Sequence, residues 1–372
     1  MDVAIIGGGV IGLGIAWRAA LAGMSVVLFD PAPGSGASHV AAGMLAPVGE
    51  AHFGEQELLG LNLASWRRYP SFVAELEEAS GIDVGFRAAG TLLVARDADD
   101  SVLLEREHRF RESLHLDVLR VTSAECRALE PRLSPRVRGG ILAAGDMQVD
   151  PRRLVAALLV ACERSNVRIV RMAAALRVDE GGVSGVRFGN STIPAVQVVL
   201  AAGCWSARVE GLPDGVAPPV RPIKGQLIRL QDAGVARFTS RVVRGVDAYL
   251  VSRDDGTVVV GSTVEERGFD TNVTAGAVYE LLRDARELVP DIAELRVVET
   301  LAGLRPGTPD NAPIIGETEL HGLVVATGHY RNGILLTPAT ADAVAAMLAG
   351  APASADVAPF SPARFHRSEA LV

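Results

Sequence analysis

The first twelve residues constrain the fold of this chain more than any other stretch. The apolar run Val3–Ile6 carries no charge and leads directly into Gly7-x-Gly9-x-x-Gly12. Such a run predicts a buried parallel strand. The three glycines are those of a dinucleotide fold: they permit a tight turn, an approach of backbone N–H groups to a pyrophosphate, and close packing of a helix on the strand. The unpaired N–H groups at the start of that helix favour phosphate.

A second strand strengthens this interpretation. The segment Ser25–Phe29 is followed by Asp30, eighteen residues after Gly12, where an acid would hold a ribose hydroxyl. The glycines alone are equally consistent with a glycine-rich turn. Together, the strand, glycines, helix, second strand and terminal acid predict a site for an adenine dinucleotide. This stretch does not distinguish NAD from FAD.

Composition limits the classes of protein that the chain can belong to. Its 372 residues predict about two domains, and 49% apolar with 22% charged residues is typical of a soluble globular protein. The net charge of −8 argues against nucleic acid or an anionic membrane as the main partner. Cys126, Cys162 and Cys204 lie far apart, which predicts neither a disulfide framework nor a zinc site, and the histidines show no metal-binding spacing. With no leader and no membrane-length apolar segment, a cytoplasmic location is expected.

Two later apolar segments predict a return to the first sheet. Val196–Leu200 ends in Ala201-Ala202-Gly203, and Gly322–Ala326 is the second such strand. Between them, residues 218–292 contain short strands and the turn Asp254-Asp255-Gly256, which predict a mostly antiparallel sheet. The fold class predicted is therefore α/β, with a Rossmann-like cofactor domain and an α+β substrate domain.

The predicted domains are discontinuous in sequence. Residues 1–83, 145–215 and 300–360 form the cofactor domain, and residues 84–144 and 216–299 form the substrate domain. Residues 361–372 are a tail, and the chain beyond Pro359 is expected to be poorly ordered. Residues 55–80 carry two helical patterns, and Pro70 is expected to break the helix between them. Residues 31–38 are expected to form an extended loop.

Four further stretches carry a family resemblance: Ala37-Ser38 with Ala42–Leu45, Val199–Ser206, Gly303–Asp310 and His329–Pro338. In this order, and after the N-terminal glycines, they resemble the FAD-dependent amine oxidases of the D-amino-acid oxidase superfamily. The resemblance covers nearly the whole chain and is greatest to the glycine oxidases of the thiamine-biosynthesis branch. It implies non-covalent FAD, a small amino-acid substrate, O2 as acceptor and a homo-oligomer.

The resemblance also implies which residues contact FAD. The turn at the pyrophosphate would comprise Gly7, Gly9, Val10, Ile11 and Gly12, and the ribose would be contacted by Asp30 and Pro31. Along the isoalloxazine side would lie Ala37, Ser38, Ala42, Gly43 and Met44, with Ala175 at the adenine and Ala202 and Gly203 after the strand at residues 196–200. The segment around the flavin pyrimidine ring would comprise His329, Tyr330, Arg331, Asn332, Gly333, Ile334 and Leu335.

Four residues are implied on the substrate side. Arg305 would bind a carboxylate with its planar fork, and the alternative is a structural salt bridge. Tyr249 would help to hold the same carboxylate, unless it is a core aromatic residue. Arg331 would lie near the substrate amine or the entrance, unless it faces phosphate or the surface. Met44 would limit the side-chain pocket to small amino acids, unless it only fills a gap in the core.

Two positions depart from the family pattern. Asp247 stands where the glycine oxidases often have His, and Val264 replaces a Met near the substrate side chain. Both departures bear on the substrate, not on FAD or the carboxylate. His52, close to Glu55, is interpreted as part of a helix start.

The predicted reaction is oxidation of glycine or another small amine acid by hydride transfer to flavin N5. It gives the imino acid, then the oxo acid and ammonia, with H2O2 from O2, and it possibly supplies thiazole synthesis for thiamine. No catalytic acid or base is expected, because the flavin accepts the hydride. The alternatives are a flavin dehydrogenase or oxidase of D-amino acids, sarcosine or proline, and a non-catalytic dinucleotide-binding sensor.

Overall fold

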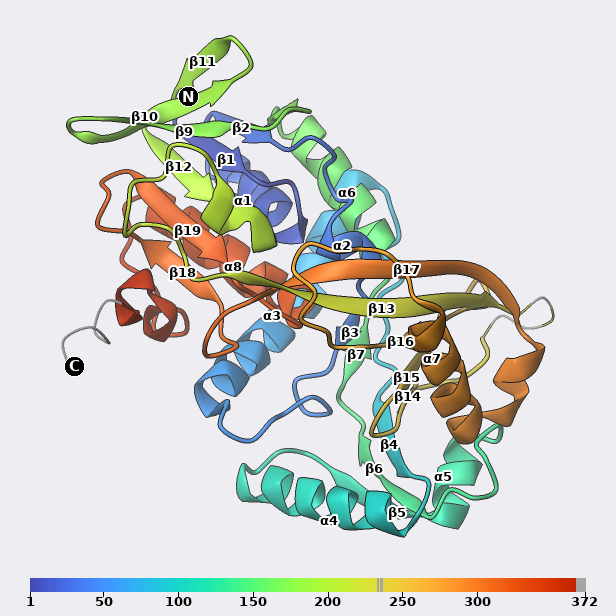
Figure 1. The fold of residues 1–372 in the computed structure, drawn as a ribbon. Coiled ribbons are helices and arrows are strands. Elements are labelled where there is room, and N and C mark those ends of the chain that lie inside the picture. The colour runs from blue at the N-terminus through green and yellow to red at the C-terminus, as the bar shows by residue number, and fades with distance from the viewer. Residues whose placement is uncertain (233, 235–236, 366–372) are drawn as a thin grey trace.

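The computed structural model describes residues 1–232, 234 and 237–365. Its six-stranded sheet has the order β18-β19-β12-β1-β2-β8 (Figure 1). Every neighbouring pair is parallel except β18 with β19. The strands are β1 (Val3–Ile6), β2 (Val26–Phe29), β8 (Arg168–Val170), β12 (Gln197–Leu200), β18 (Ile314–Glu317) and β19 (Leu323–Thr327). Both predicted returns to the first sheet are confirmed.

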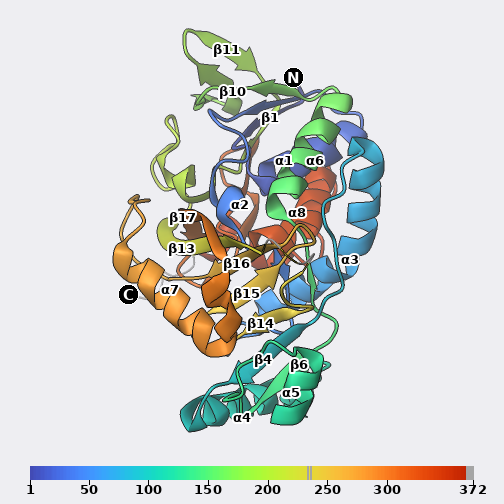
Figure 2. The ribbon, with the colours of Figure 1, turned by 90° about the vertical axis from the view of Figure 1, so that its right-hand side faces the viewer.

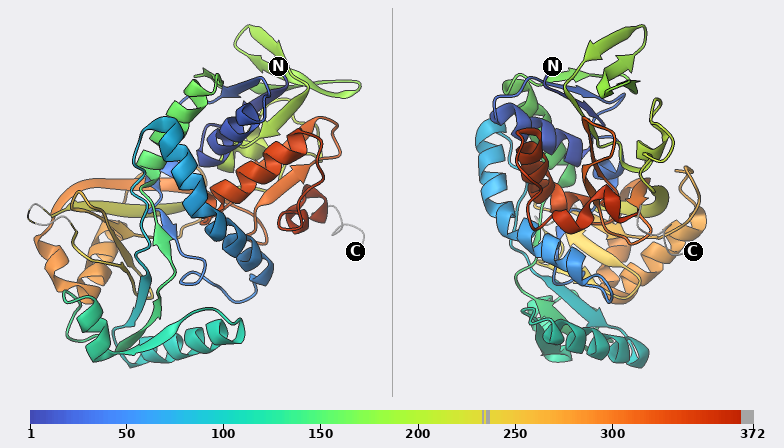
Figure 3. Two further views of the ribbon diagram at one scale, coloured as in Figure 1. Left: turned by 180° about the vertical axis from the view of Figure 1, so that it is seen from behind. Right: turned by 90° about the vertical axis from the view of Figure 1, so that its left-hand side faces the viewer.

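Helices lie on one side of this sheet (Figures 2 and 3). They are α1 (Val10–Leu21), α3 (Gln56–Ser80), α6 (Pro151–Arg164) and α8 (Gly333–Leu348). Three of them lie against its strands and the fourth, α3, lies against α6 and α8. Asp150 caps α6, since its carboxylate accepts the N–H of Arg152 at 2.8 Å, as the Asp-Pro sequence predicts. Because strand side chains alternate, Val3 and Ile5 face the helices while Ala4 and Ile6 face the other side. There they pack against a small sheet of β9 (Ala175–Asp179), β10 (Gly182–Phe188) and β11 (Ser191–Pro194).

The second large sheet has eight strands in the order β17-β13-β16-β15-β14-β4-β6-β5. All neighbouring pairs are antiparallel except β14 with β4. The strands are β4 (Thr91–Ala95), β5 (Leu119–Thr122), β6 (Gly139–Ala143), β13 (Arg221–Gln231), β14 (Val242–Arg244), β15 (Tyr249–Ser252), β16 (Thr257–Gly261) and β17 (Arg296–Gly307). A mostly antiparallel second sheet is as predicted. β17 crosses the predicted boundary at residue 300, and the domain limits stay a prediction.

The remaining elements are short or cover this second sheet. Helix α7 (Ala275–Leu288) packs on its core, and α4 (Ala98–Ser113) and α5 (Ser123–Leu129) lie at its β5 end (Figure 1). Strands β3 (Met44–Leu45) and β7 (Met147–Gln148) pair with each other. The short helices are α2 (Ala37–Val40), η1 (Gly203–Arg208), η2 (Pro290–Glu294), η3 (Ala358–Phe360) and η4 (Pro362–Arg364). No helix in the described part of the chain is both long and apolar enough to cross a membrane.

Three local predictions were wrong. Pro70 lies inside α3, which runs unbroken, because the buried Tyr69 and Phe72 on either side of it pack into the core while Pro70 itself is exposed. The predicted loop at residues 31–38 ends in the first turn of α2. Beyond Pro359, Phe360 is buried and Arg364 pairs with Asp310 at 2.8 Å, so the chain is ordered as far as residue 365. Residues 366–372 of the predicted tail lie outside the described residues.

Candidate active site

A cavity of about 900 Å³ lies at the carboxyl ends of β1, β12 and β19. Gly7, Ala201 and Thr327, at these three strand ends, all line it. The chain leaves β1 to build β2 on one side, while β12 occupies the other, so this edge is the switch point where open α/β sheets bind ligands. Strands of the second sheet close the opposite side of the cavity, which is far larger than a small amino acid requires.

The glycine turn admits no side chain at its first position. Gly7 has a φ of +117°, and a Cβ there would lie 2.3 Å from the carbonyl oxygen of Ala201. At Gly12 a Cβ would lie 1.9 Å from the Gly7 carbonyl oxygen, so α1 approaches the turn because this residue too is glycine. The Asp30 carboxylate accepts the N–H of Gly8 at 2.7 Å and of Ala32 at 2.8 Å. Asp30 therefore closes the turn, and its contact with a ribose stays a prediction.

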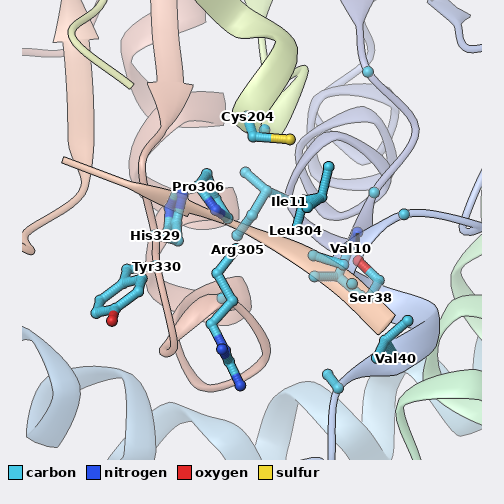
Figure 4. Close-up of a pocket in the computed structure, with 18 of the residues that line it drawn as sticks. Val10, Ile11, Ser38, Val40, Cys204, Leu304, Arg305, Pro306, His329 and Tyr330 are labelled. Atoms are coloured by element: carbon cyan, nitrogen blue, oxygen red, sulfur yellow. Dashed lines mark hydrogen bonds between the residues drawn. The ribbon is translucent and has the colours of Figure 1, made fainter. Parts of the chain in front are cut away.

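The segment after Asp30 folds over the start of α1. Ser38, on α2, accepts the Val10 N–H at 3.1 Å, and Figure 4 shows the two side by side. The buried guanidinium of Arg253 donates to the Ala42 carbonyl, and burial lowers its pKa to about 10. Sequence reasoning missed Arg253, which holds the predicted flavin-side segment from the turn between β15 and β16.

Most of the residues implied to contact FAD line this one cavity. They are Gly7, Gly9, Val10, Ile11, Asp30, Pro31, Ala37, Ser38, Ala42, Gly43, Met44, Ala175, Ala202, Gly203, His329, Tyr330, Arg331, Gly333 and Ile334. Three others do not line it. Gly12 packs on the turn, Asn332 is the buried N-cap of α8, and Leu335 lies in the core.

The loop before α8 has a fixed geometry. The buried His329 has its Nε2 3.0 Å from the hydroxyl of Thr340, and burial lowers the pKa of His329 to about 3, so the ring is neutral. Tyr330 has a φ of +45°, and its N–H donates to the Pro306 carbonyl at 3.0 Å. The loop is thereby tied to β17, where Arg305 lies (Figure 4).

Arg305 extends from β17 into the cavity (Figure 4). Its guanidinium donates to the Ser262 hydroxyl at 2.7 Å and to the Thr263 carbonyl at 3.1 Å. Among the described residues, no carboxylate lies within ion-pair distance of it, so the alternative of a structural salt bridge is not observed. At Gly225, on the neighbouring strand, a Cβ would lie 2.2 Å from the guanidinium, which explains the glycine there.

Tyr249 and Arg305 are brought together through Ser262. Tyr249 lies on β15 opposite Gly261, where a Cβ would be 2.4 Å from the tyrosine hydroxyl. Burial raises the pKa of Tyr249, while the positive charge of Arg305 and a hydrogen bond with Ser262 oppose that rise. The phenol is therefore neutral and able to donate. The carboxylate roles of Arg305 and Tyr249 stay predictions.

Arg331 and Met44 also line the cavity, but Arg331 is already paired. Its guanidinium bonds to the Glu55 carboxylate, and both side chains are mostly buried. This pair joins α8's entry loop to the start of α3, across 276 residues. The positive charge of Arg331 is thus largely neutralised, which leaves Arg305 as the better carboxylate site of the two.

Sequence reasoning missed a second group of charged residues at the cavity. Glu50 and His52 lie in the loop before α3, and Arg244 on β14 pairs with Glu50 at 3.4 Å. Burial and the nearby Arg331, Arg244 and Arg111 guanidinium groups lower the pKa of His52 to about 3, so it is neutral. His52 lines the cavity and lies before α3, which begins at Gln56, so its interpretation as part of a helix start was wrong. No sequence signal marks this group, because its members meet only through tertiary packing.

The two departures from the family pattern lie at the cavity rim. The Asp247 carboxylate pairs with Arg96 at 2.7 Å, and the Val264 side chain is 66% exposed. Among the described residues, no cluster of three His, Cys, Asp or Glu side chains could hold a metal ion.

The family model described as "FAD dependent oxidoreductase" matches residues 2–347. The chain belongs to this family. Glycine oxidase of Geobacillus kaustophilus is 36% identical over 97% of the chain and 96% of that protein. The crystal structure of glycine oxidase from Geobacillus kaustophilus matches with a TM-score of 0.91, 36% identity and 98% of each chain covered. The bifunctional protein ThiO/ThiG of Synechocystis is 35% identical over 98% of the chain but only 54% of that longer protein.

The cofactor of this oxidoreductase is FAD, and the described residues fit it. Because Gly7 has no Cβ, the end of β1 lies directly against the Ala201–Ala202 backbone, and the turn borders the cavity with Gly7 and Gly9. The first turns of both α1 and α8 border the same cavity, where their N–H groups would face the negatively charged groups of the cofactor. FAD would itself supply the electron acceptor, so no residue that lines the cavity is needed for that role.

Proposed function

We propose that this oxidoreductase oxidises glycine or another small amine acid. The observation that carries the proposal is Arg305, a cation in the cofactor cavity with no carboxylate partner among the described residues. An arginine fork binds a carboxylate through two parallel hydrogen bonds. The names of the relatives, glycine oxidase and ThiO/ThiG, support the same substrate class.

The chemistry divides between the cofactor and the protein. FAD, when bound, supplies the acceptor for a hydride from the substrate Cα. Arg305 binds the substrate carboxylate and Tyr249 donates a further hydrogen bond, so the Cα–H bond is held in one orientation. Ser262 keeps the Arg305 guanidinium in place. The net reaction converts glycine, O2 and water into glyoxylate, ammonia and H2O2, by way of the imine.

No protein side chain is required to take the Cα hydrogen as a proton. The two histidines of the cavity, His52 and His329, are neutral and have lowered pKa values, which makes them weak bases. The substrate amine must be neutral to form the imine, so activity is expected to rise with pH as the amine loses its proton. Met44 at the cavity wall limits the space beside the substrate Cα.

The biological setting is part of the same proposal. The ThiO/ThiG relative supports a role in which the imine of glycine supplies thiazole formation for thiamine. We place the enzyme in the cytoplasm and expect a homo-oligomer, with a small amino acid and O2 as the reactants and no nucleic acid or membrane partner.

The test is an anaerobic titration of the purified holoenzyme with glycine, sarcosine, D-alanine and D-proline, monitored by flavin absorbance. Bleaching by glycine at the lowest concentration is the expected result. Bleaching by D-alanine or D-proline alone would overturn the glycine assignment. If no amine acid bleaches the flavin, the protein is not an oxidase of this class and the sensor alternative is favoured. Stoichiometric H2O2 with O2 as sole acceptor then separates an oxidase from a dehydrogenase.

A further inference from the structure

Helix α8 has a defect in the first turns, next to the cofactor cavity. Gly333 and Ile334 line the cavity, and the α-helix continues through Pro338. Proline has no N–H, so the carbonyl of Ile334 lacks the donor that it would otherwise receive four residues later. An unpaired buried carbonyl costs free energy and favours a local bend of the helix.

Two hydroxyl groups of α3 repair this defect. The Tyr69 hydroxyl donates to the Ile334 carbonyl at 3.0 Å. The Ser65 hydroxyl donates to the Leu335 carbonyl at 2.6 Å and accepts the Ala339 N–H at 3.3 Å. In a regular α-helix these two backbone groups would bond to each other, so the hydroxyl lies between them. Tyr69 and Ser65 are four residues apart on one face of α3, and both are completely buried.

The two hydroxyl groups are held rigidly. The Tyr69 ring packs edge-on against Phe72, with centroids 6.0 Å apart, and is stacked with Phe86 at 6.3 Å. Burial raises the pKa of Tyr69, so its hydroxyl remains a protonated donor at any physiological pH. Neither hydroxyl lines the cavity, and thus neither can contact substrate or FAD.

We propose that Tyr69 and Ser65 are positioning residues that orient the first turn of α8 toward the cofactor. This orientation makes the reduction potential of the flavin less negative. The N–H groups of that turn have no partners within the helix, and they carry the partial positive charge of the helix N-terminus. A reduced flavin carries more negative charge than an oxidised one, so donors aimed at it favour reduction. The inference concerns FAD alone and goes beyond the proposed substrate.

The test measures the flavin, not turnover. Sulfite binds oxidised flavin as an anion, so its Kd reports the positive potential at the ring. In the Tyr69→Phe holoenzyme, we expect this Kd to rise about fivefold, in line with the loss of about 1 kcal/mol of helix-terminus stabilisation. The midpoint potential should become more negative. Tyr279→Phe is the matched control, because this tyrosine lies on α7 and is 66% exposed.

Pro338→Ala tests the cause, because alanine restores the missing N–H. In a Pro338→Ala background, Tyr69→Phe should change the sulfite Kd by less than it does in the wild type. If Tyr69→Phe only lowers the Tm and leaves the sulfite Kd and the potential unchanged, the proposal is wrong. An equal effect in both backgrounds would also overturn it.

A second variant guards against loss of FAD on Tyr69→Phe. Ser65→Ala carries the same expectation, and Ser71→Ala is its control, since the exposed Ser71 hydroxyl bonds only within α3. A failure of glycine to bleach the flavin would refute the proposed substrate, whereas the sulfite shift would still be measured. The two proposals therefore fail separately.

Discussion

The cofactor side and the substrate side of the cavity differ in which atoms of the chain form them. On the cofactor side, backbone atoms form the site, and the turn at Gly7 exists because side chains are absent. On the substrate side, the side chains of Arg305 and Tyr249, from β17 and β15, form the site on top of a finished sheet. A substitution that disturbs a site made of backbone also disturbs the fold around it. A substitution in a site made of side chains is expected to alter the site while the fold stays intact.

Gly7→Ala should have the largest effect. The new Cβ would lie 2.3 Å from the Ala201 carbonyl oxygen, at a φ of +117°, so β1 and β12 cannot keep their present spacing at this end. We expect the purified protein to contain almost no FAD, measured as the ratio of flavin to protein absorbance. Gly23→Ala is the control, because Gly23 also has a positive φ, of +86°, but has open space around it. A Gly7→Ala protein with full FAD content would contradict the role of the turn.

Arg305→Ala should separate the two sides. The variant keeps β17 and its pairing with β13, so FAD content is expected to match the wild type. Loss of a charge-assisted carboxylate contact should lower kcat/KM for glycine about 100-fold or more, mainly through KM. Steady-state H2O2 production gives both constants, and Arg221→Ala, at an exposed position on β13, is the control. Unchanged kinetics would remove Arg305 from the site.

The same contrast explains what could be predicted from sequence. The β1–α1–β2 unit, the glycine turn and Asp30 follow local rules of spacing and strand composition, and so does the cap at Asp150. These features depend on neighbours within a few residues along the chain. The two later strands of the first sheet could also be predicted, because a fully apolar run that ends in small residues is typical of a strand buried in a parallel sheet.

The features that sequence missed are contacts between distant side chains. Tyr69 meets Ile334 across 265 residues, and Arg331 meets Glu55 across 276. No local pattern marks such pairs, since the packing of α3 against α8 creates them. Pro70 shows the converse case: a local rule predicted a break, and burial of the residues around it kept α3 continuous.

The substrate side also has a buried acid that should make stability depend on pH. Asp146 accepts the N–H of Gly49 at 3.0 Å, which anchors the loop that carries Glu50 and His52, and burial raises the pKa of Asp146 to about 7. Between pH 4 and 7 the unfolded chain has lost this proton while the folded protein retains it. The free energy of unfolding should therefore fall as pH rises through this range, by on the order of 4 kcal/mol, and then level off.

Asp146→Asn should remove this contribution, because the amide is neutral throughout. Urea unfolding of the holoenzyme at pH 5 and pH 8 checks it: the variant should lose less stability between the two pH values than the wild type. Asp117→Asn, at an exposed carboxylate, is the control. An identical pH dependence in wild type and Asp146→Asn would show that Asp146 is ionised in the folded protein across the range.

Ser38→Ala should have the smallest effect, because it removes a single side-chain hydrogen bond from a cofactor side that is built mainly of backbone. Its hydroxyl accepts the Val10 N–H at 3.1 Å and so fixes α2 against the start of α1. Removal of one such bond is worth about 1 kcal/mol, which predicts about a fivefold rise in the Kd for FAD. Titration of the apoprotein with FAD, followed by fluorescence quenching, measures it, with Ser101→Ala on α4 as the control. Tighter binding would show instead that Ser38 competes with the cofactor for the Val10 N–H, and the backbone turn would then be sufficient on its own.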